Sequence, residues 1–100
     1  MLKNTCIDFK FEDGDSVKMT LTFYALYLLK TKNKKIYDEY NKIAANGVKE
    51  ELDLILILYT AYLCANMDED CISFEEFIIK CGSGRKKIRE TVAILQSPKN

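Results

Sequence analysis

The feature that most constrains this fold is a long apolar run in the middle of the chain, residues 49–65. When the run is placed on a helix at 100° per residue, apolar side chains cover nearly the whole circumference, and only Lys49, Asp53 and Thr60 form a narrow polar strip. The run exceeds the usual buried-strand length of about 4 to 8 residues and ends in Ala65-Asn66, so the pattern favours a helix. Such a helix is either enclosed on all sides or turns one side toward a partner.

The sequence leaves both alternatives open. In a chain of 100 residues, a hairpin and four other helices suffice to enclose the run. The partner alternative predicts a docking surface or an oligomer interface on this helix, because helix-in-groove recognition uses apolar anchors at helical spacing. Its predicted binding residues are Leu52, Ile55, Leu56, Tyr59, Tyr62 and Leu63.

An N-terminal β-hairpin is predicted over residues 4–21, because apolar residues alternate there with polar ones. The apolar positions are Ile7, Phe9 and Phe11 in the first strand and Val17, Met19 and Leu21 in the second. Asp13-Gly14 marks the turn. A loop with an odd number of residues, three or five, keeps both apolar sets on one face and places Phe9 against Met19.

Residues 22–96 are predicted to form the helical region. A short, mostly buried helix begins at Thr22, and an amphipathic helix follows from the N-cap Asn33 to Asn46-Gly47. After the central run, the capping box of Ser73 and Glu76 begins a short helix that ends near Gly82. A last helix begins around Ser83 and buries Ile88, Val92 and Leu95; residues 97–100 are expected to fray. We therefore expect one mainly α domain over residues 1–100, a small bundle of about five helices with an N-terminal β-hairpin.

Composition narrows the possible partners. Fifteen basic and fifteen acidic residues cancel, so no overall field draws the chain to nucleic acid or to an anionic membrane. Residues 1–10 lack the apolar stretch of a signal peptide, and no apolar run is long enough to cross a bilayer. A cytosolic protein is expected, whose four cysteines remain buried thiols.

Calcium binding and catalysis are both disfavoured. The acidic segment 67–77 is similar to the second half of an EF-hand loop, but with Glu76 as the twelfth position the first and third are Ala65 and Met67 and the glycine position is Asp70. The chain has no histidine, no phosphate loop after a strand and no nucleophile elbow. No catalytic residue, cofactor or metal is therefore predicted, and an enzyme is not expected.

The two C-terminal helices suggest an alternative function. Joined at Cys81-Gly82, they resemble a helix-turn-helix whose second helix carries basic residues suited to the major groove: Arg85, Lys86, Lys87 and Arg89. Acidic residues close by in sequence would repel phosphate, so a solvated basic face is favoured over a DNA-binding regulator.

Three segments together resemble a known protein family. They are a threonine-led apolar helix at 21–30, a tyrosine-rich end of the central helix at 58–66, and the acidic helix start Ser73-Phe74-Glu75-Glu76-Phe77. In this order they look like the tail assembly chaperones of long-tailed phages of Gram-positive bacteria. The resemblance covers about residues 17–79 and rests on pattern, without a chemically unique motif.

The resemblance implies a mostly helical, non-enzymatic protein of the host cytoplasm that is absent from the mature virion. Its implied partners are the tape-measure protein, whose apolar helices it would keep in solution, and the tail tube protein. Self-association is also expected. The last helix and the N-terminal strands depart most from the family pattern, so client contacts cannot be transferred to them.

Overall fold

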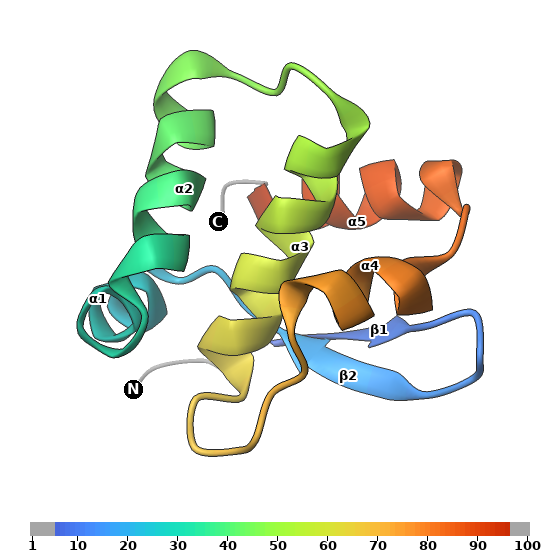
Figure 1. Cartoon of the computed structure of the whole chain (residues 1–100), viewed down its shortest axis with the longest axis horizontal. Coiled ribbons are helices and arrows are strands. Elements are labelled where there is room, and N and C mark those ends of the chain that lie inside the picture. Colours follow the sequence, from blue (N-terminus) through green and yellow to red (C-terminus); the bar gives the residue numbers. More distant parts are fainter. Residues whose placement is uncertain (1–5, 97–100) are drawn as a thin grey trace.

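The predicted hairpin and helices are all found in the computed structural model, which describes residues 6–96 (Figure 1). In chain order its elements are β1 (Ile7–Lys10), β2 (Ser16–Met19), α1 (Phe23–Lys32), α2 (Lys34–Asn46), α3 (Glu51–Ala65), α4 (Phe74–Cys81) and α5 (Arg85–Gln96). The first two residues of the predicted hairpin and the tail at 97–100 lie outside the described residues. The protein is therefore mainly α, as expected.

Helix α3 is the axis about which the other elements are arranged. It packs against β2, α1, α2, α4 and α5, whereas α1 packs against α2 and α3 (Figure 1). The hairpin is attached to α3 through its backbone, because the Thr20 amide donates a hydrogen bond to the Ala61 carbonyl at 3.1 Å. The buried apolar side chains form one cluster around this helix. Within residues 6–96, no helix combines the length and the apolar character needed to cross a bilayer.

The hairpin has the predicted loop but not the predicted pairing. Five residues separate the strands, and the register pairs Ile7 with Met19 and Phe9 with Val17, so the expected pair of Phe9 and Met19 is wrong by two residues. A shift of two keeps the same side chains on the same face, so Phe9 and Met19 are still both buried. Phe11 follows β1, its amide donates a hydrogen bond to the Asp15 carbonyl at 2.7 Å, and its ring packs edge-on against that of Phe77, 5.4 Å between ring centroids.

The helix boundaries follow local capping chemistry. The side-chain oxygens of Thr22, Asn33 and Ser73 accept hydrogen bonds from the amides three residues later, at 3.1, 3.3 and 3.2 Å. Gly47 ends α2 with a φ of 87°, a conformation that costs glycine little. The predicted N-caps at Asn33 and Ser73 and the end of α2 are confirmed.

Candidate docking surface

The structure decides between the two alternatives for the central helix in favour of enclosure. Of the predicted binding residues, only Leu52 has an exposed side chain (46%). The other five are in the core of the monomer: Ile55, Leu56, Tyr59, Tyr62 and Leu63. The folded monomer therefore does not present these five side chains on its surface, because the hairpin and four helices cover the circumference of α3; that they bind a partner stays a prediction. These residues stabilise the fold.

The polar atoms of α3 also serve the interior. The Tyr59 hydroxyl donates to the Ile72 carbonyl at 2.8 Å, and the Ile72 amide donates to the Tyr62 hydroxyl at 3.1 Å. Burial raises the pKa of both tyrosines, so both hydroxyls remain protonated at neutral pH. The Thr60 hydroxyl, fully buried, donates to the Leu56 carbonyl. The two tyrosines thus attach the loop before α4 to α3.

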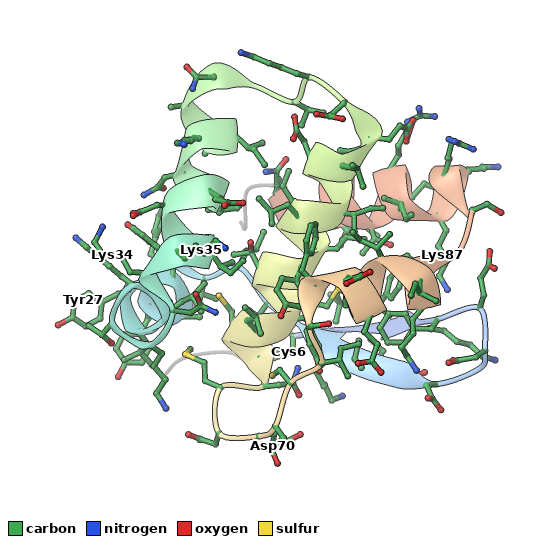
Figure 2. The ribbon with its side chains drawn as sticks, in the orientation of Figure 1. Cys6, Tyr27, Lys34, Lys35, Asp70 and Lys87 are labelled. Carbon is green, nitrogen blue, oxygen red and sulfur yellow. The ribbon has the colours of Figure 1, made fainter. Side chains whose placement is uncertain are left out.

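The exposed aromatic surface lies on α1, which the sequence predicted to be mostly buried. Phe23 is 92% exposed, and Tyr24 and Tyr27 are each 65% exposed. Ala25 and Leu29 are the buried residues of this helix. The rings of Tyr24 and Tyr27 stack at 6.3 Å between centroids. We call Phe23, Tyr24 and Tyr27 the α1 patch; Figure 2 labels Tyr27 at the outer edge of the molecule.

The α1 patch continues into a groove between α1 and α2. This α1–α2 groove has a volume of about 370 Å³ and is lined by Phe23, Leu26, Tyr27, Lys30, Tyr37, Tyr40, Asn41 and Ala44. The Lys30 ammonium lies 5.8 Å from the centroid of the Tyr37 ring, within the range of a cation–π contact. Aromatic side chains therefore form much of the groove lining, with a cation at its edge. Such surfaces anchor partner helices or peptides.

The groove lies in the basic part of a neutral molecule. Residues 22–46 contain five lysines against Asp38 and Glu39, a net charge of +3, whereas the whole chain has a net charge of 0. Lys34 and Lys35 lie on the same side of the molecule as Tyr27 (Figure 2). Within this segment Lys34 already pairs with Asp38 at 2.7 Å. A partner that carries carboxylates would meet a favourable field here.

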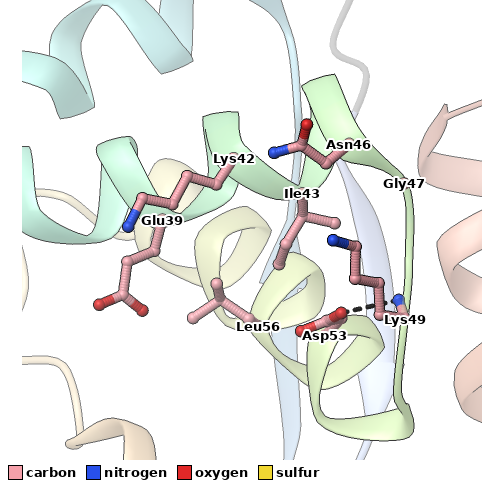
Figure 3. Close-up of a pocket in the computed structure, with 8 residues that line it drawn as sticks. All are labelled: Glu39, Lys42, Ile43, Asn46, Gly47, Lys49, Asp53 and Leu56. Carbon is pink, nitrogen blue, oxygen red and sulfur yellow. Dashed lines mark hydrogen bonds between the residues drawn. The ribbon is translucent and has the colours of Figure 1, made fainter.

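A second hollow, between α2 and the start of α3, has a structural explanation (Figure 3). It measures about 330 Å³ and is lined by Glu39, Lys42, Ile43, Asn46, Gly47, Lys49, Asp53 and Leu56. The Asp53 carboxylate accepts hydrogen bonds from the amides of Lys49 and Glu50 at 2.8 and 3.3 Å. This carboxylate therefore satisfies free amides at the start of α3, as an N-terminal capping group does.

The geometry of α4 and α5 disfavours the DNA-binding alternative. The two helices form as predicted, but three of the four basic residues on α5 have partners within the molecule. Arg85 and Arg89 both interact with Glu51. Lys87 donates to the Lys10 carbonyl and lies 4.6 Å from the centroid of the Phe9 ring. The Glu51 carboxylate beside the two arginines would repel phosphate, and the contacts of α5 join it to α3 and to the hairpin.

Reactive groups are scarce in the part of the chain that the structure describes. No cluster of three His, Cys, Asp or Glu side chains there has the geometry to hold a metal ion. Burial raises the pKa of the Cys64 thiol to about 12 and that of Cys81 to about 11, so both stay protonated and unreactive at neutral pH. The clearest chemical feature of the surface is therefore the α1 patch with its groove.

Comparisons of the chain with protein-family models, curated protein sequences and solved structures found no match.

Proposed function

We propose that this chain is a phage tail assembly chaperone, a non-enzymatic binding protein of the host cytoplasm that keeps the tape-measure protein in solution and helps to recruit tail tube subunits. The sequence pattern over residues 17–79 supports this family. The observation that carries the proposal is the α1 patch, because a monomer rarely exposes neighbouring large aromatic side chains without a binding role.

The client surface in this proposal is α1, not α3. A tape-measure segment is a long apolar helix, and its side chains would lie across Phe23, Tyr24 and Tyr27 and reach into the α1–α2 groove. Tyrosine suits such a surface because its ring offers apolar area while its hydroxyl remains hydrated when no client is bound. The core formed by α3 stays closed during binding, so the client is bound without unfolding of the chaperone.

Co-expression with a phage tape-measure protein tests the proposal. The parent protein should raise the soluble fraction of the tape measure, and the double variant Phe23→Ser/Tyr27→Ser should lose this effect. Both substituted side chains are exposed, so circular dichroism should show an unchanged fold. The matched control is Val48→Ser/Ile94→Ser, which removes two exposed apolar side chains away from α1 and should retain activity.

Two results would contradict the proposal. The first is full solubilisation by the folded Phe23→Ser/Tyr27→Ser variant, which would remove the α1 patch from the function. The second is the presence of this chain in purified virions, because an assembly chaperone leaves the finished tail and a structural tail protein does not.

A further inference from the structure

A second surface, on α4, has the opposite character to the α1–α2 groove. Ile79 is 71% exposed, and Glu75 and Glu76, one turn earlier, are exposed on the same side of the helix. The other side of α4 is held in the core by Phe77 and Cys81. We call Glu75, Glu76 and Ile79 the α4 face; it presents one aliphatic side chain beside two carboxylates.

The charges of the two surfaces complement each other. Residues 68–79 contain five acidic residues and no basic one, a net charge of −5, whereas residues 22–46 carry +3. The two segments already meet within one molecule, where the Lys32 ammonium lies 3.8 Å from the Asp68 carboxylate, so the charges offered to a second copy are those of Glu75 and Glu76 on α4 and of Lys30 in the groove. In the groove, aromatic rings lie beside Lys30, and on the α4 face an isoleucine lies beside glutamates. This is the complementarity of an apolar anchor with a charged rim that protein interfaces use.

One molecule cannot bring its own two surfaces together. Helices α1 and α4 each pack against α3, and they lie on different sides of it in Figure 1. The fully buried Phe77 fixes α4 in place, and its ring stacks with that of Tyr62 at 5.4 Å between centroids. A contact between the groove and the α4 face must therefore join two copies.

We propose that the α4 face of one copy binds in the α1–α2 groove of a second copy, with Ile79 against Phe23 and Tyr27 and with Glu75 and Glu76 near Lys30. The two surfaces differ, so the contact is heterologous, and each copy keeps one groove and one α4 face free for further copies. Repetition of such a contact produces a closed ring or an open helical chain.

The contact should be weak and sensitive to salt. Helix α4 has eight residues and is about 12 Å long at 1.5 Å per residue, so the interface belongs to the small, transient class below about 1,200 Å². At an ionic strength of about 1 M the Debye length falls to about 3 Å, which should shift assemblies toward monomer. Phe23 and Tyr27 belong both to the proposed client surface and to the α1–α2 groove that binds a second copy. A bound client and a neighbouring copy would therefore compete for α1.

Sedimentation velocity of the purified chain alone tests this inference, so its failure would not depend on the proposed client. The parent should show a sedimentation coefficient that rises with concentration up to about 1 mM, a range suited to weak association. Tyr27→Glu should abolish binding by the groove, and Ile79→Lys should abolish binding by the α4 face. Each variant alone should remain monomeric. Ile94→Lys, at an exposed apolar residue of α5, is the matched control and should assemble like the parent.

A mixture of the two defective variants gives the sharpest result. Tyr27→Glu keeps an intact α4 face and Ile79→Lys keeps an intact groove, so an equimolar mixture should form a heterodimer and nothing larger. Three outcomes would overturn the inference: a parent that is monomeric at every concentration, a mixture that stays monomeric, or assembly of Ile79→Lys alone. The last outcome would assign self-association to a symmetric contact between α1 helices instead.

Discussion

Because α3 lies in the core, the same substitution should lower the free energy of unfolding by different amounts at two positions one turn apart. Leu56→Ala removes a side chain that is 6% exposed, and Leu52→Ala removes one that is 46% exposed. A buried Leu-to-Ala change costs about 3 to 5 kcal/mol in transfer and cavity terms. Because Leu56 borders the hollow of Figure 3, which allows some collapse, we expect about 3 kcal/mol. Leu52 should cost about 1 kcal/mol, in proportion to its partial burial.

Urea denaturation followed by circular dichroism measures both values. With a slope of about 1.5 kcal/mol per M for a domain of this size, the unfolding midpoint should fall by about 2 M for Leu56→Ala and by less than about 1 M for Leu52→Ala. Both variants should stay folded without denaturant, because domain stabilities are about 5 to 15 kcal/mol. Equal, small shifts at both positions would refute the reasoning, since Leu56 would then belong to a surface and not to the core.

Two further predictions concern the turn of the hairpin and the C-terminus of α4. Gly82→Ala should lower the free energy of unfolding by about 2 kcal/mol, because Gly82 has a φ of +63°, a conformation that an alanine adopts only with strain. A second substitution, Glu12→Ala, should recover little of this loss, because the Glu12 carboxylate near an added Cβ is the end of a flexible side chain and can move away; full recovery in urea titrations would contradict the reasoning. The Lys80 ammonium lies 2.8 Å from the Asp13 carboxylate and holds the pKa of that carboxyl below 3.8. The stabilisation of the fold by this ion pair is therefore present above pH 3.8 and is lost as the pH falls through the lowered pKa. NMR titration of Lys80→Ala should return the Asp13 pKa toward 3.8, and an unchanged value would exclude Lys80 as the cause.

Much of the local structure could be predicted because it depends on neighbouring residues. The caps at Asn33 and Ser73 act on amides three residues away, so a short sequence window contains all the information. The apolar face of α5 likewise follows from helical spacing, and its predicted residues Ile88, Val92 and Leu95 are buried.

The hairpin shows where local reasoning loses precision. Alternation indicated which side chains share a face, and Phe9 and Met19 are both buried as it predicted. It also indicated a loop with an odd number of residues, which the register confirms. Alternation cannot distinguish two registers that differ by two residues, because both keep the same faces. In the observed register the ring of Phe11, just after β1, packs against Phe77 far along the chain, a contact that a short sequence window does not contain.

The predicted binding residues lie on α3, whereas the exposed aromatic side chains lie on α1. Both helices carry apolar side chains around most of their circumference, and the sequence left open whether the longer run is enclosed or turned toward a partner. A weak signal did favour α1: its tyrosines at 24 and 27 tolerate water, and lysines follow directly. That signal was outweighed by the length of the central run.

The sequence by itself determined the order, type and approximate ends of the elements, because periodicity and capping act over a few residues. Only the tertiary structure decided which apolar helix is enclosed. Burial depends on how many other elements reach a helix: five pack around α3, whereas α1 has packing partners on one side and keeps Phe23, Tyr24 and Tyr27 in contact with solvent. Enclosure is thus set by the arrangement of the whole chain and not by the hydrophobicity of one segment.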